Sequence, residues 1–485
     1  MRNLLYVVAV TVALLTSCTK DISDLNIDPK NPSTAPSYSF FTNAQRSLSN
    51  TLASSNVNLN IFRLITQHWQ ETQYPEESQY DIGTREINDN FWNALFRDVL
   101  RDLREAKALT PVDVVNPDGS ANSGHQQNNL AMIEILEIYT WYYLVTTYGN
   151  IPYSEALNID DPFPKYDDAK TIYDDLLARL DVAIGQLNPA EPGLGEADLI
   201  YGGNVDQWKK FANSLKLKMG ITIADVDDAK ARETIESAVA GGVFTSNEDN
   251  ALLKYLGAPP NTNPIWVDLV QSGRDDFVAA STLVNELLDL KDPRIDNFFT
   301  EDQAGRGSPT TSYSGADPGV QSAYIQYSHV HPNITAPDFP HVLMDYSEVE
   351  FYLAEAAQRG YDVGGSASEH YANGVTASIL YWGGTPAEAA TYLAQPGVAY
   401  SPATFKQQIG IQQWIAFYNR GVDAWISWRR LDSPQLQPAH DALSDIPKRF
   451  PYPVNEQNVN TAHYQQAAEQ IGGDVVETKL WWDIF

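Results

Sequence analysis

The chain has 485 residues, and its 62 Asp and Glu outnumber its 32 Lys and Arg, giving a net charge of −30. Hydrophobic residues make up 43% and aromatic residues 11%, which excludes a disordered or low-complexity protein. The negative charge argues against nucleic acid or an anionic membrane surface as the partner, because both repel such a chain. The single cysteine excludes an intramolecular disulfide and any CxxC metal or redox site.

The N-terminus predicts a lipoprotein signal peptide over residues 1–17. Arg2 precedes an apolar run from Leu4 to Leu15, which is too short for a membrane span but suits a signal-peptide core. The run ends in the lipobox Leu15-Thr16-Ser17-Cys18. We expect cleavage before Cys18 and acyl chains on its thiol, with residues 18–30 as a lipidated tether to the membrane. An ordinary secretory signal with an incidental cysteine is the alternative.

Helical periodicity dominates the first half of the mature chain. Apolar residues recur every three or four positions in four segments, which are 91–106, 172–187, 208–219 and 228–240. The first of these is expected to stop at Thr110-Pro111, and the last at Gly241-Gly242.

Helix start signals continue in the second half. Ser347 and Glu350 have the spacing of a capping box, before a helix expected to end at Gly360. Thr385, Pro386 and Glu388 combine a cap, a proline in the first turn and a capping acid. Strand-like alternation is sparse, and Tyr324–Tyr327 is the best candidate strand.

The expected fold is all-α, with tetratricopeptide-like helix pairs stacked into one scaffold and few short strands. Helices that cannot bury their faces alone must stack, as in repeat proteins. The clearest pairs are 127–147 with 170–187, 207–224 with 228–240, and 345–359 with 367–382. No linker composition appears, so residues 31–485 are predicted to form a single domain.

Long polar loops separate the helices, and loops of this length are usually functional. They cover residues 55–88, 111–126, 189–206, 256–276 and 300–340. Catalytic motifs such as GxSxG, HExxH, Walker A and GxGxxG are absent from the sequence. A glycoside hydrolase needs only two suitably spaced carboxylates, and Glu71 with Glu76 or Glu77 is the candidate pair. We nevertheless expect no catalysis.

Two segments resemble metal sites only weakly. His329 and His331 could present two imidazoles from one extended segment, but no third ligand is suggested nearby. Asp118 and Asn122 lie in a loop like a calcium loop, without its spacing or its final glutamate. We therefore predict neither a metal nor a cofactor.

Aromatic residues within the polar loops are the distinctive feature. Sugars present apolar C–H faces and hydroxyl edges, so aromatic rings beside polar side chains suit their binding. The predicted ligand-binding residues are Trp69, Tyr74, Tyr80, Trp92, Trp266, Arg274, Asp276 and Tyr313. Core packing is the alternative role for each aromatic residue in this set.

Several motifs, in order along the chain, resemble the SusD/RagB family of nutrient-binding outer-membrane lipoproteins. The N-terminal ones are the lipobox, Thr147-Tyr148-Gly149-Asn150-Ile151-Pro152-Tyr153, Tyr173-Asp174-Asp175-Leu176 and Trp208-Lys209-Lys210-Phe211-Ala212-Asn213-Ser214-Leu215-Lys216. The others are Asp292-Pro293-Arg294, Phe351-Tyr352-Leu353-Ala354-Glu355-Ala356, Trp425-Ile426-Ser427-Trp428-Arg429-Arg430, Arg449-Phe450-Pro451-Tyr452-Pro453, Glu456, Asn460 and Trp481-Trp482-Asp483. Asp21 and Asp24 also resemble the surface-export signal of Bacteroidota-type lipoproteins.

The resemblance implies a function and a partner. Such a protein sits on a TonB-dependent (SusC-like) outer-membrane barrel, captures oligosaccharides at the cell surface and hands them over without cleavage. It also implies four tetratricopeptide-like units and a loop-rich ligand face. Peptide cargo, a lipid-anchored hydrolase and a surface scaffold that binds only protein remain open alternatives. The acidic chain favours neutral or cationic cargo over acidic polysaccharides.

Overall fold

The computed structural model describes residues 35–302 and 312–485, so Cys18 and the rest of the predicted signal peptide and tether up to residue 30 lie outside the described residues. The first half contains α2 (Ser37–Ala53), α3 (Phe62–Ile65), α4 (Ile87–Asn93), the π-helical η2 (Ala94–Leu100), α5 (Arg101–Asp113), α6 (Ser123–Tyr148), α7 (Ala169–Gln186), α8 (Val205–Thr222) and α9 (Asp228–Gly241). The second half contains α10 (Pro264–Trp266), the π-helical η5 (Val267–Gln271), α11 (Ser281–Asp289), α12 (Ile295–Phe298), α13 (Tyr346–Gln358), α14 (Ala367–Tyr381), α15 (Pro386–Leu393), α16 (Phe405–Ala416), α17 (Gly421–Leu431), α18 (Val454–Val459) and α19 (Thr461–Gln470).

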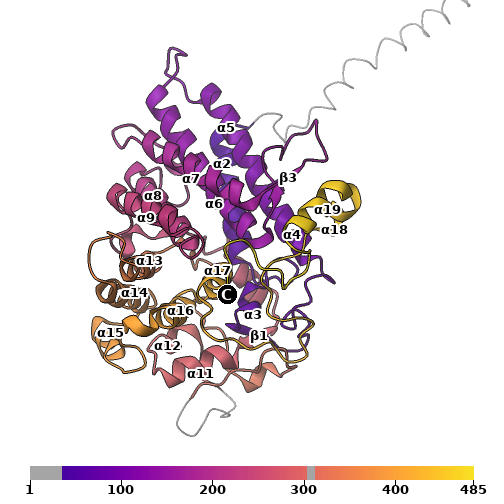
Figure 1. Ribbon diagram of the computed structural model, residues 1–485, viewed down its shortest axis with the longest axis vertical. Coiled ribbons are helices and arrows are strands. Elements are labelled where there is room, and N and C mark those ends of the chain that lie inside the picture. The colour runs from indigo at the N-terminus through magenta and orange to yellow at the C-terminus, as the bar shows by residue number, and fades with distance from the viewer. Residues whose placement is uncertain (1–34, 303–311) are drawn as a thin grey trace, which may run out of the picture.

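The predicted helix pairs are confirmed. Helices α6 and α7, α8 and α9, and α13 and α14 pack against one another, and α2 pairs with α5. Contacts of α5 with α6, α7 with α8, and α8 with α13 join the pairs into one array (Figure 1). The loops and short helices of the remaining chain gather on one side of this array, around α3 and β1 (Figure 1). The mainly helical fold expected from the sequence is therefore correct.

Helix ends follow the predicted signals in three places and depart from them in two others. Thr385 and Glu388 form the expected capping box at α15, and Gly242 ends α9 with a φ of 93°. Helix α5 continues through Pro111 to Asp113, so the predicted stop is wrong. Proline removes one backbone donor and crowds the carbonyl four residues before it, and α5 ends two residues after Pro111.

The predicted capping box at Ser347 is wrong by two residues. Asp345 caps α13 instead, because its carboxylate accepts a 2.8 Å hydrogen bond from the Glu348 amide. The Ser347 hydroxyl donates to the Gly374 carbonyl of α14 at 2.8 Å and so ties the helix pair together. The helix ends before Gly360, as expected, where φ is 79°.

The strands lie elsewhere than the sequence suggested. Tyr324–Gln326 forms a 3-10 turn, in which the Gln326 amide donates to the Ala323 carbonyl at 3.0 Å, so the strand predicted there is wrong. Three antiparallel two-stranded sheets are present among the described residues. They are β1 (Trp69–Glu71) with β5 (Phe277–Ala279), β2 (Ile151–Pro152) with β3 (Tyr166–Asp167), and β4 (Ala251–Leu253) with β6 (His341–Met344).

A buried group of charged residues joins the helix array to the C-terminal helices. Lys218 of α8 forms ion pairs with Glu348 of α13 at 2.9 Å and with Asp423 of α17 at 2.5 Å. Arg420 also pairs with Glu348 and Asp423, and with Asp345 at 3.3 Å. Removing one partner of such a group leaves another charge unpaired in the interior, so its members hold the packed helices in one arrangement.

Candidate ligand-binding cleft

A polar cleft opens where the loop after α2 faces the β1–β5 sheet and η5. Its volume is about 740 Å³, which is within the range of small-molecule sites. The lining residues are Ser55, Asn56, Val57, Asn58, Glu71, Thr72, Gln73, Tyr74, Arg85, Val267, Asp268, Ser272, Arg274, Asp276 and Phe277. These residues come from two of the long loops predicted from the sequence to be functional, 55–88 and 256–276, or lie directly beside them.

Backbone pairing fixes the floor of the cleft. In the β1–β5 sheet Glu71 lies opposite Phe277, and just beyond it the Thr72 amide donates to the Asp276 carbonyl at 2.9 Å. The Thr72 hydroxyl donates to the Asp275 carbonyl at 2.7 Å. Segments more than 200 residues apart in the chain are thus held in register where the cleft opens.

Glu71 and Glu77 form a buried acid pair at one end of the cleft. The Glu71 carboxyl accepts hydrogen bonds from the amide and hydroxyl of Ser78 at 2.8 and 3.0 Å. Burial, together with the neighbouring Glu77, raises the pKa of Glu71 to about 9. One carboxyl oxygen of Glu77 is buried and has no hydrogen-bond partner among the described residues. Glu71 therefore faces the cleft as a neutral acid at pH 7.

The arginines of the cleft already have carboxylate partners. Arg85 pairs with Glu77, and Arg274 lies 3.5 Å from Asp276. On the opposite wall the Ser55 hydroxyl donates to Asp268 at 2.9 Å, and burial raises the pKa of the Asp268 carboxyl.

Apolar surface is also offered to a ligand. The side chain of Tyr74 is 68% exposed, so its ring is free for contact with a ligand. Val267 of η5 is likewise exposed at 38% and lines the cleft with Val57. An exposed ring beside amides and charged groups is the combination that suits a sugar, whose faces are apolar and whose edges are polar.

The structure brings three of the predicted ligand-binding residues together: Tyr74, Arg274 and Asp276. Trp69 does not reach the cleft, because it is only 1% exposed. Its ring packs 5.7 Å from that of Phe277, a residue of the cleft wall, and so supports the cleft from behind. The prediction that the Trp69 ring faces a ligand is therefore corrected.

The remaining predicted aromatic residues lie outside the cleft. Tyr80 is 3% exposed and its hydroxyl accepts from the Ala439 amide, while Trp92 is 6% exposed and packs against Phe96 and Tyr148. Both are core residues, which corrects their prediction as ligand contacts. Trp266 in α10 is half-buried beside Val267, and the half-buried Tyr313 donates its hydroxyl to Asp296 at 2.6 Å.

The two weak metal candidates have other contacts. The His329 ring stacks on the Tyr324 ring, with 3.7 Å between the ring centroids. The His331 Nδ1 accepts a hydrogen bond from the Asn333 amide at 3.2 Å. Asp118 accepts from Ser120 within a tight turn, and Asn122 caps α6. Within residues 35–302 and 312–485, no group of three or more metal-ligating side chains is arranged to hold an ion.

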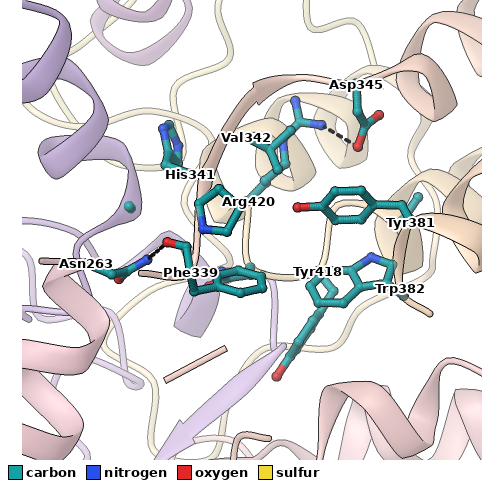
Figure 2. A pocket seen from close by; sticks show the side chains of 13 residues that line it. Asn263, Phe339, His341, Val342, Asp345, Tyr381, Trp382, Tyr418 and Arg420 are labelled. Carbon is teal, nitrogen blue, oxygen red and sulfur yellow. Dashed lines mark hydrogen bonds and ion pairs between the residues drawn. The ribbon is translucent and has the colours of Figure 1, made fainter. Parts of the chain in front are cut away.

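A second cavity beside Arg420 is too small for a sugar (Figure 2). Its volume is about 10 Å³, which is room for about one water molecule. Figure 2 shows Arg420 directed at Asp345, with Tyr381 and Trp382 lining the other side. Burial lowers the pKa of His341 in its wall to about 3, so that this imidazole is neutral. This cavity belongs to the buried charge group described above.

Sequence reasoning missed several residues of the cleft. The sequence does not distinguish Asn56, Asn58 and Asp268 from the other polar residues of their loops. Arg85 lies in the 55–88 loop, but nothing in the sequence shows that it pairs with Glu77. Loop length predicted which segments are functional. Which of their side chains line the same cleft is seen only in the folded structure.

Comparison with known proteins identifies the family. Residues 29–453 match the model of the SusD-like family, described as starch-binding and associating with the outer membrane. The chain belongs to the SusD-like family. No curated protein sequence matches it.

Solved SusD-like structures share the fold over almost the whole chain. A chitin-binding protein is 28% identical, with a TM-score of 0.80 over 93% of this chain and 100% of that one. A SusD homologue from Bacteroides uniformis is 26% identical, with a TM-score of 0.76 over 92% and 99%. A chitin-binding SusD homologue from Flavobacterium johnsoniae is 22% identical, with a TM-score of 0.77 over 92% and 98%, and shows the fold alone.

The SusD-like family binds glycans and is associated with the outer membrane. None of the helices in the described part of this chain is long and apolar enough to cross a membrane.

Proposed function

We propose that this protein is a cell-surface lipoprotein that captures nutrient oligosaccharides and delivers them to a TonB-dependent, SusC-like outer-membrane barrel. Membership of the SusD-like family supports a role in glycan binding at the outer membrane. The lipid on Cys18 holds the protein at the membrane in this proposal, and the barrel takes up the cargo.

The cleft is the observation that carries the proposal. The exposed Tyr74 ring and the Val267 side chain offer apolar surface to the C–H face of a sugar. The side chains of Asn56, Gln73 and their polar neighbours can bond its hydroxyl groups. Two of the similar structures are of chitin-binding proteins, so N-acetylated chito-oligosaccharides are the first ligands to test.

Binding without cleavage fits the acid pair better than hydrolysis does. Glycosidases hold their two carboxyl groups about 5–9.5 Å apart, with the scissile bond between them. Glu71 and Glu77 are instead buried, at 5% and 1% exposure, so neither carboxyl is open to a sugar as a glycosidase acid must be. Glu76, the other candidate partner, is exposed.

The test uses the mature protein without its lipid. Isothermal calorimetry against N-acetylated chito-oligosaccharides, cello-oligosaccharides, malto-oligosaccharides and short peptides should show saturable binding to at least one oligosaccharide. Chromatography of the same mixtures should recover the ligand intact. Binding of peptides alone would indicate that the protein captures peptides instead of glycans. Accumulation of shortened sugars would indicate that it is a hydrolase.

A further inference from the structure

We propose that the cleft selects uncharged glycans over anionic ones, because each of the two arginines that line it already has an acidic partner. This inference rests on the proposed glycan-binding function and concerns the same cleft. An anionic glycan, such as one built of uronic or sulfated sugars, needs a free cation for its charged groups.

Arg85 already has an acidic partner, Glu77, at one end of the cleft. Arg85 pairs with Glu77, whose side chain is 1% exposed, and the hydrogen bond between the two raises the pKa of the Arg85 guanidinium. Drawing Arg85 toward a ligand anion would leave the buried Glu77 carboxylate without the cation that pairs with it among the described residues. The cost of an uncompensated buried charge opposes that movement.

Arg274, on the opposite side of the cleft, interacts with more than one acidic residue. Arg274 lies 3.5 Å from Asp276, and its charge also reaches the Asp268 carboxyl. Asp275 is the next residue in the chain and is exposed. An exposed pair such as Arg274 and Asp276 is weak by itself. The carboxylates around Arg274 are therefore the stronger barrier to an anion.

The formal charges of the lining residues can be compared directly. Among the lining residues, Arg85 and Arg274 contribute two positive charges, and Asp268 and Asp276 contribute two negative ones. Outside the lining, Glu77 is paired with Arg85, and the charge of Arg63 also reaches Asp268. Glu71 adds none, because it is protonated at pH 7. The lining thus carries no excess of positive charge, so it leaves neutral sugars unaffected and offers no free cation to a carboxylate or sulfate.

The experiment compares ligands and variants at low ionic strength, where surface charges act most strongly. Calorimetry should show that wild-type protein binds hexagalacturonate at least about tenfold more weakly than its best neutral oligosaccharide of equal length. Asp276→Asn frees Arg274 and should raise the ratio of galacturonate to neutral affinity by about fivefold. Asp268→Asn should shift the ratio in the same direction.

Asp206→Asn is the matched control, since it makes the same charge change at an exposed residue of α8 that does not line the cleft. It should leave the ratio at the wild-type value. Wild-type protein that binds hexagalacturonate as tightly as a neutral oligosaccharide would overturn the inference, and so would an unchanged ratio in Asp276→Asn. If wild-type protein binds no oligosaccharide at all, the proposed function itself fails.

Discussion

The indole nitrogen of Trp69 donates a 3.0 Å hydrogen bond to the hydroxyl of Tyr418, although the two residues are 349 positions apart in the chain. The bond ties β1, which forms part of the cleft floor, to the segment between α16 and α17. The Tyr418 hydroxyl in turn donates to the Phe298 carbonyl at 3.0 Å. A tryptophan that the sequence suggested as a ligand contact therefore positions the cleft from within the core.

Replacing Tyr418 with phenylalanine tests this role. Tyr418→Phe leaves the buried Trp69 N–H without a partner and removes one of the two donors to the Phe298 carbonyl, which keeps its bond from the His331 amide. The unpaired N–H should cost about 1–3 kcal/mol of unfolding free energy. Urea titration measures the cost. A double-mutant cycle with Trp69→Phe should be non-additive, because both substitutions remove the same bond. Additive losses would show that the bond contributes nothing.

Breaking the buried charge group around Lys218 and Arg420 should lower the unfolding free energy by more than Tyr418→Phe does. Arg420→Met leaves Asp345, Glu348 and Asp423 with Lys218 as their remaining cation within this group, so the unfolding free energy should fall by about 3–5 kcal/mol. Arg97→Met is the control, since Arg97 pairs with Asp98 on the surface at 2.7 Å and should cost under about 1 kcal/mol. Equal losses in the two variants would contradict a structural role for the group.

Glu71 gives the protein a definable pH dependence. The folded state raises its pKa from 4.5 to about 9, so its stabilising proton is fully present below pH 4.5 and its contribution is lost as pH rises toward 9. Glu71→Gln carries a neutral amide at every pH, so the variant should lose less unfolding free energy than wild type over this interval. Urea titrations at about pH 5, 7 and 9 compare the two proteins. Parallel stability curves would mean that Glu71 ionises normally.

The lipobox prediction concerns residues outside the described structure and can be tested directly. Cys18→Ser removes the only thiol in the chain and should release the protein from the membrane fraction. Metabolic labelling with a fatty acid should mark the wild type and leave Cys18→Ser unlabelled. A variant that still fractionates with membranes and carries label would contradict anchoring through Cys18.

The sequence predicts helices better than it predicts side-chain surroundings, for physical reasons. The periodicity of α7 and α8 and the capping box at Thr385 are local, so they can be recognised without the fold. Asp345 displaced Ser347 as the cap of α13 because Ser347 bonds to the neighbouring helix α14, a contact between separate parts of the chain.

The residues of the cleft were also predicted only in part from the sequence. Its segments were predicted from loop length, and Tyr74, Arg274 and Asp276 were identified from composition. Tyr80 and Trp92 have similarly polar sequence neighbours but are buried. Whether an aromatic ring in a polar loop faces solvent depends on partners far along the chain, such as Ala439 for Tyr80, and these are set by tertiary packing.

Calorimetry of Tyr74→Ala beside Tyr38→Ala tests the central claim most directly. Both tyrosines are exposed, at 68% and 53%, but only Tyr74 lines the cleft. An aromatic contact contributes about 0.5–1.5 kcal/mol beyond its buried area, so Tyr74→Ala should weaken binding of the preferred oligosaccharide roughly tenfold. Tyr38→Ala should bind like the wild type. Unchanged affinity in Tyr74→Ala, with saturable binding retained in both variants, would place the glycan elsewhere and contradict the account.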